Sequence, residues 1–309
     1  MGWTPTQLPD QSGKTTIITG GNSGLGLEAA RILAGKHARV VITSRSAGKA
    51  QEAIALIRQT VPDASIDFVV LDLADAASVT AAAAALRGLC PRIDAIVNNA
   101  GVMQPPETRT GEGYELQMAT NHLGHFRLNA LLLDVVEASG GRFVPVSSIA
   151  HKMGKIQLDD LQSTHGYDAM TAYAQSKLAN LLYGFELQRR LAARGSKATS
   201  IPCHPGYAAT NLQSTGVGMD GGSAFWRLFY KFSNAVMAQS AEAGAYPLVL
   251  AAADPTARPG AYYGPTGLQQ TRGPVGESFV ADVAKDEAVA RGLWEKTEAL
   301  MGPFFPPPG

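Results

Sequence analysis

The sequence predicts a single α/β domain in which a doubly wound parallel sheet of about seven strands has helices on both faces. Short β-branched or apolar runs alternate with helical patterns along the 309 residues, which is typical of parallel strands joined by crossover helices. No polar linker separates two halves of the chain, and no internal repeat is visible. The expected strands span residues 15–19, 39–43, 65–71, 93–97, 142–146, 198–203 and 260–264.

Composition argues against several classes of function. The formal net charge is zero, so nothing indicates attraction to nucleic acid or to anionic lipid. The two cysteines, Cys90 and Cys203, fit neither a disulfide framework nor a metal site, and we expect free buried thiols and no metal. Residues 1–14 lack a secretory signal pattern, and no apolar run reaches the roughly 18 residues of a membrane span. We therefore expect a cytoplasmic protein without a membrane span.

A glycine-rich turn follows the first expected strand and precedes an amphipathic helix that extends to about Gly35. This order favours phosphate binding, because glycines let the backbone approach a pyrophosphate and the N–H groups at the helix start hold the anion. The alternative is a tight turn closed by small residues. The cofactor-binding candidates in the turn are Gly20, Asn22, Ser23, Gly24, Leu25 and Gly26.

The end of the second expected strand indicates which dinucleotide is bound. In dinucleotide-binding folds this position lies beside the adenosine ribose, where an acidic residue selects NAD. Here Ser44 and Arg45 occupy it, with Lys49 one helical turn later. A guanidinium suits a phosphate, and the carboxylate is absent, so we predict NADP(H) rather than NAD(H). The alternative is that Arg45 is a surface residue and selectivity is loose.

The next two strand ends add further candidates for cofactor contacts. Asp72, followed by Leu73, can accept a hydrogen bond from the adenine amino group, or it can cap the helix that begins at Ala76. The fourth expected strand leads into small residues, which let a cofactor lie against the backbone, and into asparagines, which can tie strands together. These residues are Asn98, Asn99, Ala100 and Gly101.

The candidate acid/base group is the pair Tyr173 and Lys177, at the head of a helix expected over residues 174–194. Residues four apart share one helix face, and a nearby ammonium favours the phenolate. A group that exchanges a proton with an alcohol near neutral pH needs such a lowered pKa. A tyrosine and a lysine at this spacing are common by chance, so the acid/base interpretation depends on the residues found at the strand ends.

Three more polar residues belong to this hypothesis. Asn121 lies inside a long helix expected over residues 113–138, where asparagine is unfavourable. It either positions a water linked to Lys177 or bonds back to its own helix. Ser147 and Ser148 follow the fifth expected strand, and strand alternation sends them to opposite faces, so only one can point at a substrate.

The last third of the chain contains a candidate lid. The sixth expected strand ends in His204, Pro205 and Gly206, with Thr210 soon after. An aromatic amphipathic helix is expected over residues 222–232, and we interpret residues 207–238 as a lid over an apolar substrate. An interfacial membrane helix or a core helix is the alternative. Helices are expected over 240–252 and 286–301, followed by a loosely ordered tail, 303–309.

Taken together, these motifs make the chain resemble the short-chain dehydrogenase/reductase family, which implies a single-domain Rossmann-type fold. The resemblance covers about residues 13–265 and is closest to the retinol dehydrogenase-like branch. The segments that carry this branch resemblance are 120–126 (TNHLGHF), 147–151 (SSIAH) and 172–182 (AYAQSKLANLL). Membrane-bound retinol dehydrogenases generally have an N-terminal apolar anchor, which the printed sequence lacks. The resemblance therefore supports the chemistry and a lipophilic substrate more than it supports retinol.

The resemblance implies a role for each candidate. Tyr173 supplies the proton, Ser148 binds the developing alkoxide, and Asn121 positions a water that connects Lys177 to solvent. Lys177 holds the nicotinamide ribose and lowers the pKa of Tyr173 together with the oxidised cofactor. Pro205, Gly206 and Thr210 join the residues above as cofactor contacts. The implied activity is NADP(H)-dependent interconversion of an alcohol and its ketone or aldehyde.

Two other functions stay open at this point. Some proteins with this fold bind a dinucleotide as sensors or scaffolds, although these usually lack the tyrosine or the lysine, and both are present here. Reduction of an activated C=C bond, as in protochlorophyllide reductases, would use the same pair. The family also implies a homodimer or homotetramer that forms through the long helices, here 121–138 and 174–194.

Overall fold

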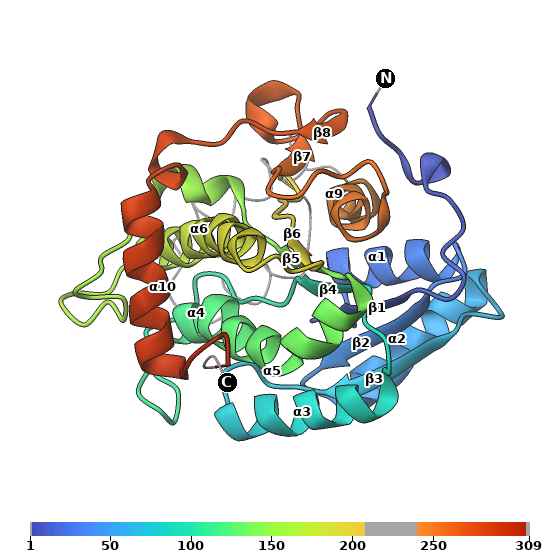
Figure 1. Cartoon of the computed structure of the whole chain (residues 1–309), viewed down its shortest axis with the longest axis horizontal. Helices are drawn as coiled ribbons and strands as arrows, with labels where there is room; N and C mark the ends of the chain where they lie inside the picture. The colour runs from blue at the N-terminus through green and yellow to red at the C-terminus, as the bar shows by residue number, and fades with distance from the viewer. Residues whose placement is uncertain (1, 208–239, 307–309) are drawn as a thin grey trace, which may run out of the picture.

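Six parallel strands form the centre of the computed structural model, which describes residues 2–207 and 240–306 (Figure 1). The strand order β3-β2-β1-β4-β5-β6 reverses direction between β1 and β4, where dinucleotide-binding folds place their ligand. The expected doubly wound sheet is confirmed, with six strands rather than seven. The strands are β1 (Thr15–Ile18), β2 (Arg39–Ser44), β3 (Ile66–Val70), β4 (Ala95–Asn98), β5 (Arg142–Pro145) and β6 (Thr199–Ser200).

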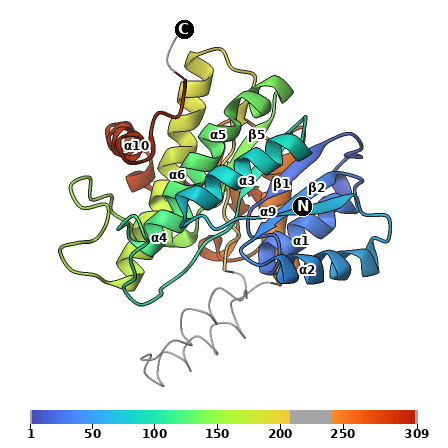
Figure 2. The ribbon, with the colours of Figure 1, turned by 90° about the horizontal axis from the view of Figure 1, so that it is seen from below.

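Helices cover both faces of the sheet because successive strand residues point in opposite directions. In β1, for example, Ile18 packs into one apolar core and Ile17 into the other, and both are fully buried. One face is covered by α1 (Gly24–Ala34), α2 (Ala47–Thr60) and α9 (Ala241–Ala253). The other is covered by α3 (Ala76–Leu89), α5 (Gly124–Ser139) and α6 (Ala169–Ala193), which Figure 2 shows side by side.

The seventh expected strand, 260–264, does not extend the sheet. Residues Tyr263–Pro265 form β7, which pairs antiparallel with β8 (Val275–Glu277) and meets the sheet edge through a single bridge between Cys203 and Tyr263. Strand β6 is also shorter than the expected 198–203. The pairing with β5 is interrupted at Pro145, which has no N–H to donate to the Ile201 carbonyl, although Ile201 N and Cys203 N still donate to the Phe143 and Pro145 oxygens. Both Cys203 and Cys90 are free and buried, as expected.

The helix expected over residues 113–138 begins at Leu116 and continues without a gap to Ser139, but one of its turns is π-helical. A short α4 (Leu116–Met118) leads into a π-helical turn, η2 (Ala119–Leu123), and α5 then begins at Gly124. A side chain at Gly124 would collide with the Leu73 carbonyl, since a Cβ there would lie 2.2 Å from that oxygen. The extra residue of a π turn is common at functional sites, and here the turn contains Asn121.

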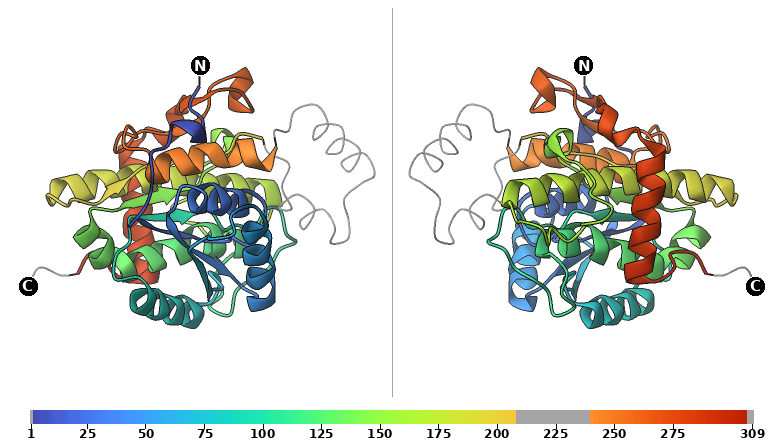
Figure 3. Two further views of the ribbon diagram at one scale, coloured as in Figure 1. Left: turned by 90° about the vertical axis from the view of Figure 1, so that its right-hand side faces the viewer. Right: turned by 90° about the vertical axis from the view of Figure 1, so that its left-hand side faces the viewer.

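The C-terminal helix α10 (Glu287–Met301) lies outside the layered core and crosses α6 (Figure 3). Beyond it, Phe304 is buried and meets the ring of Phe126 edge-on at a centroid distance of 5.0 Å. The expectation of a loosely ordered tail from residue 303 is therefore wrong for Phe304, because an aromatic cluster on α5 and α10 anchors it. Residues 307–309 lie outside the described residues. This packing covers part of the α5 and α6 surface, and the oligomeric state stays a prediction.

Two expectations fall outside the part of the chain that the structure describes. Of the candidate lid, 207–238, only Tyr207 is described, and Thr210 is not. Within residues 2–207 and 240–306, none of the helices has both the length and the apolar character needed to cross a bilayer.

Candidate active site

The glycine-rich turn lies between β1 and α1, at the carboxyl edge of the sheet. Gly20, the first residue of the turn, packs against Ala100. A Cβ on Gly26 would lie 2.5 Å from the Gly20 oxygen and 2.6 Å from Asn99 Nδ2. Ser23 occupies the N-cap position of α1, but its side chain makes no capping hydrogen bond. The N–H groups of the first helical turn therefore remain available to an anion. These features fit the pyrophosphate of a dinucleotide.

The turn after β4 is fastened to the turn after β1. Asn99 Nδ2 donates to the Thr19 carbonyl oxygen at 2.8 Å, and Ala100 N donates to Thr19 Oγ1 at 2.9 Å. A Cβ on Gly101 would lie 2.9 Å from Asn121 Oδ1 and 3.5 Å from Lys177 Nζ. The structure thus brings the residues that follow β4 next to Asn121 and Lys177. Only a glycine leaves room there.

At the end of β2, Ser44 is buried while Arg45 and Lys49 are exposed. Ser44 Oγ accepts from Ser46 N at 3.2 Å, and Ser46 in turn caps α2 by accepting from Lys49 N. Among the described residues, neither the Arg45 nor the Lys49 side chain forms an ion pair. The arrangement leaves a guanidinium and an ammonium available to a phosphate at this corner.

Asp72 does not cap helix α3. Its carboxylate accepts from Ala74 N at 3.0 Å, whereas the α3 cap is Asp75, which accepts from the amides of Ala77 and Ser78. The capping alternative for Asp72 is therefore wrong, and its contact with adenine stays a prediction. Leu73 is buried and its carbonyl packs against Gly124.

The two serines after β5 have different partners. Ser148 caps the short 3-10 helix η3 (Ile149–Met153) and accepts from Ala150 N at 3.2 Å. Ala150 packs against Tyr173, and the Ser148 side chain lies near enough to that phenol to lower its pKa. Ser147 Oγ instead donates to the Lys177 carbonyl oxygen at 2.8 Å. The structure therefore brings together Ser148 and Tyr173 and holds Ser147 away from them.

Tyr173 and Lys177 are both buried, and burial sets their pKa values. It raises the pKa of Tyr173 to about 12, an effect that the nearby Ser148 side chain only partly offsets. Burial also lowers the pKa of Lys177 to about 8. Lys177 Nζ donates to the Val146 carbonyl at 3.2 Å and lies 5.9 Å from the centroid of the Tyr173 ring. In the protein alone, desolvation outweighs the expected lowering of the Tyr173 pKa by Lys177, and the phenol stays protonated.

The Asn121 side chain bonds outside its own helix, so the back-bonding alternative is wrong. Its Oδ1 accepts from Val102 N at 2.8 Å, and its Nδ2 donates to the Val102 oxygen at 3.0 Å and to Ser176 Oγ at 2.9 Å. These bonds hold η2 against the turn after β4 and against α6. The water link between Asn121 and Lys177 stays a prediction.

Pro205 and Gly206 follow the sixth strand and lie beside the loop of Thr271. Gly206 N donates to His204 Nδ1 at 3.2 Å, and a Cβ on Gly206 would lie 2.4 Å from the Thr271 oxygen. Their role toward a cofactor stays a prediction.

A family model for short chain dehydrogenases matches residues 14–217. The chain belongs to the short-chain dehydrogenase family. The polyprenol dehydrogenase of Mus musculus is 36% identical over 305 residues, which cover 96% of this chain and 87% of that protein. Human retinol dehydrogenase 13 is 38% identical over 301 residues, covering 94% and 85%. An uncharacterised protein of Mycobacterium paratuberculosis has a solved structure with a TM-score of 0.80 and 36% identity, covering 99% of this chain and 100% of that one.

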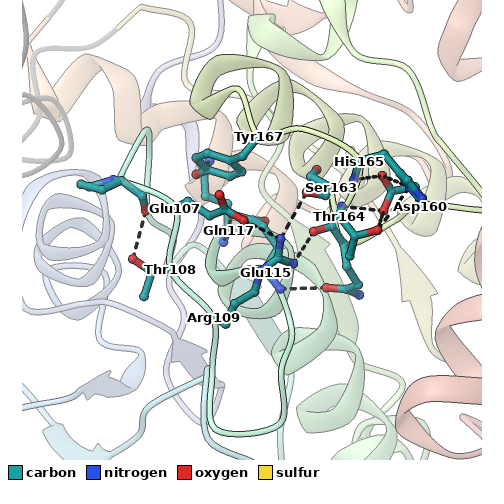
Figure 4. Close-up of polar contacts among 12 residues, drawn as sticks. Glu107, Thr108, Arg109, Glu115, Gln117, Asp160, Ser163, Thr164, His165 and Tyr167 are labelled. Atoms are coloured by element: carbon teal, nitrogen blue, oxygen red, sulfur yellow. Dashed lines mark hydrogen bonds and ion pairs between the residues drawn. The ribbon is translucent and has the colours of Figure 1, made fainter.

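In this short-chain dehydrogenase, a polar network beside the site escapes prediction from the sequence (Figure 4). Glu115 is buried and accepts from Gln117 N at 2.9 Å and Met118 N at 2.6 Å. Gln117 Nε2 donates to Tyr167 Oη at 3.0 Å and to the Ala169 oxygen at 2.9 Å. The network fastens the segment before α6 to the segment after β4 and so fixes the helix start that precedes Tyr173. Glu115 and Gln117 lie within the helix expected over residues 113–138, where a polar side chain gives no sign of burial.

The apolar surroundings of Tyr173 also escape prediction. Met103 and Met170 pack against a small cluster that consists of Ala150, Tyr173 and Ala174. Met170 lies three residues before Tyr173 and thus on the same face of α6. That spacing is the signal that the sequence offers for this contact.

We predict that Ser148→Ala lowers kcat by a factor of roughly 100 to 1,000, as the loss of a donor to a developing oxyanion does. Ser147→Ala should lower kcat by less than about tenfold, because the Ser147 hydroxyl contacts a backbone carbonyl and not Tyr173. Steady-state kinetics of both variants with one ketone checks this ranking. A larger loss in Ser147→Ala would assign the role to the other serine.

The lowered pKa of Lys177 predicts a pH-dependent stability. The unfolded lysine, with a pKa of 10.5, binds its proton more tightly than the folded one, with a pKa of about 8, so folding stability rises with pH between these values. Relative to Lys177→Met, the free energy of unfolding of the wild type should rise by roughly 2 kcal/mol from pH 7 to pH 10. Urea unfolding of both proteins measures this difference. A flat difference would mean that burial leaves the pKa of Lys177 unshifted, and a falling difference would mean that the folded protein favours the charged lysine.

Proposed function

We propose that this chain is an NADP(H)-dependent oxidoreductase that interconverts a primary or secondary alcohol and its aldehyde or ketone on a lipophilic substrate. The observation that supports this most is the convergence of Ser148 and Lys177 on Tyr173. Ala150, whose amide donates to Ser148, packs against the tyrosine, and Lys177 Nζ lies 5.9 Å from the centroid of its ring. Membership of the short-chain dehydrogenase family supports the class of reaction.

Ser148 and Tyr173 would bind the substrate carbonyl oxygen between their hydroxyl groups. NADPH, when bound, supplies the hydride. Tyr173 is protonated at neutral pH, and burial moves its pKa further above the ordinary value of 10, so it can donate the proton in the reduction direction. The amide of Ala150 donates to Ser148 Oγ, which leaves the Ser148 hydrogen free to stabilise negative charge on the substrate oxygen.

Lys177 would hold the ribose of the nicotinamide half of the cofactor. An ammonium has three donors, and the described contacts of Lys177 Nζ use one of them on the Val146 carbonyl. The amine lies beside Gly101, in the turn that follows β4. Bringing a positive charge of the oxidised cofactor next to this buried pair would lower the pKa of Tyr173 for the oxidation direction.

The preference for NADP(H) rests on the end of β2. Arg45 is exposed there beside the buried Ser44, and Lys49 follows on α2. A guanidinium can form paired hydrogen bonds with a 2′-phosphate, whereas the carboxylate that would bind the free 2′-hydroxyl of NAD is absent.

A lipophilic substrate is supported by the apolar groups at the acid/base residue. Met103 and Met170 adjoin Tyr173, and methionine adapts to irregular apolar surfaces. Two relatives that match most of this chain are named for lipid alcohols, polyprenol dehydrogenase and retinol dehydrogenase 13. The substrate class proposed here shares that chemistry, an apolar body with one hydroxyl or carbonyl group.

Tyr173→Phe should reduce turnover at least 1,000-fold, because it removes the proton donor. It should change the dissociation constant for NADPH by less than about threefold. NADPH consumption with a panel of bulky ketones and aldehydes measures turnover, and quenching of NADPH fluorescence measures binding. Substantial residual turnover would remove Tyr173 from this role. NADPH binding by the wild type with no turnover on the whole panel would instead support a binding protein without chemistry.

Arg45→Ala should weaken NADPH binding about 10- to 100-fold, because hydrogen bonds to a charged phosphate are lost. NADH binding should change by less than about twofold. Arg58→Ala is a matched control, since Arg58 is another exposed arginine, near the far end of α2. Fluorescence titration of both variants with both cofactors checks the prediction. Equal effects of Arg45→Ala on the two cofactors would remove the basis for NADP(H).

A further inference from the structure

His125, at the start of α5, forms hydrogen bonds on both sides of its ring. The ring is buried, with Nε2 2.8 Å from Thr19 Oγ1 and Nδ1 3.0 Å from the Asn121 carbonyl oxygen. Thr19 immediately precedes the glycine-rich turn, and Asn121 lies in the π turn. One side chain therefore bridges the cofactor-binding turn and the turn beside Lys177.

The chemistry of the two partners fixes the tautomer of His125. A carbonyl oxygen only accepts, so Nδ1 must carry the hydrogen that is donated to Asn121. In the neutral ring Nε2 is then an acceptor, and the Thr19 hydroxyl donates to it. Burial lowers the pKa of His125 to about 3, so the ring stays neutral at working pH. The histidine acts through two fixed hydrogen bonds and does not carry a proton.

The hydrogen bonds continue from each end of His125 to the site. On one side, Ala100 N donates to Thr19 Oγ1 at 2.9 Å. On the other side, Asn121 Nδ2 donates to Ser176 Oγ at 2.9 Å, and Ser176 Oγ donates to the Tyr173 carbonyl oxygen at 2.8 Å. His125 thus joins the turn after β4 to the backbone of the acid/base tyrosine.

We propose that His125 is a positioning residue that couples the cofactor-binding turns, through Thr19, to the Asn121–Ser176–Tyr173 side of the site. This inference rests on the proposed function, since it assigns the two ends to cofactor binding and to proton transfer. If the His125 ring only filled space, its substitutions would change the stability of the fold but would not change cofactor binding and turnover independently.

The adjacent His122 provides a matched control. It is buried in the same segment, but its Nε2 lies 3.1 Å from Thr297 Oγ1 on α10, on the side away from the cofactor-binding turns. Because Thr297 Oγ1 donates to the Leu293 carbonyl, His122 Nε2 is the donor in this contact. A variant of His122 therefore reports the cost of disturbing a buried histidine without breaking the proposed link.

Two substitutions of His125 each remove one of its two hydrogen bonds and keep the other. An asparagine amide reaches the position of Nδ1, so His125→Asn keeps the donor to Asn121 and loses the acceptor for Thr19. A glutamine amide reaches the position of Nε2, so His125→Gln keeps the acceptor for Thr19 and loses the donor to Asn121. The measurements are the NADPH dissociation constant by fluorescence, kcat with a bulky ketone, and the melting temperature.

We expect opposite patterns in the two variants. His125→Asn should weaken NADPH about tenfold and leave kcat within about threefold, because a lost buried hydrogen bond costs about that factor. His125→Gln should lower kcat about tenfold and leave NADPH affinity within about threefold. His122→Asn should lower the melting temperature and change neither quantity by more than about threefold. Thr19→Val should reproduce His125→Asn, and Thr19→Ser, which retains the hydroxyl, should restore affinity.

The same pattern in both His125 variants, or a change confined to the melting temperature, would overturn the proposal. The NADPH affinities distinguish failure of the coupling proposal from failure of the proposed function. If the wild type binds NADPH but reduces no ketone, the proposed reaction fails, and an unchanged NADPH affinity in His125→Asn and Thr19→Val would still overturn the coupling. If the wild type is active and both affinities are unchanged, the coupling alone fails.

Discussion

The contact between the turns that follow β1 and β4 is the interaction on which the rest of the candidate site depends. Parallel strands end at one edge of the sheet, so these turns meet where the strand order reverses. Asn99 and Ala100 donate to Thr19 and hold the glycine-rich turn in place. In the turn after β4, Gly101 lies close to Asn121 and Lys177. The backbone proposed to bind the cofactor and the side chains proposed for acid/base chemistry therefore share one hydrogen-bonded support.

Burial then determines the chemistry that this support makes available. Desolvation disfavours the charged form of each group, so it raises the pKa of Tyr173 and lowers that of Lys177. The site without cofactor consequently favours a neutral phenol, the form that reduction of a carbonyl requires. Lysine alone does not overcome this cost, and a further positive charge must approach to favour the phenolate. In this account the direction of proton transfer follows the charge of the bound cofactor.

The sequence was sufficient to predict the sheet, its strand ends and the residues gathered there, because glycine spacing and strand alternation are local signals. It could not choose between Ser147 and Ser148, since that choice depends on whether the hydroxyl meets the Lys177 carbonyl or Tyr173. The π turn at Asn121 and the burial of Phe304 arise from tertiary packing, which leaves no local pattern. His125 belongs to the 120–126 segment that carries the family resemblance, but its bridging contact with Thr19 could not be predicted, because Thr19 is more than 100 residues away in the sequence.

Transfer of deuterium from NADPH labelled at C4 to a bulky α,β-unsaturated ketone tests the central claim most directly. We expect the label at the carbon of the former carbonyl, an intact C=C bond, and no transfer in Tyr173→Phe. Mass spectrometry and NMR of the product locate the label. Deuterium at the β-carbon with an intact carbonyl, or NADPH binding without any transfer to a panel of such ketones, would contradict the proposed reaction.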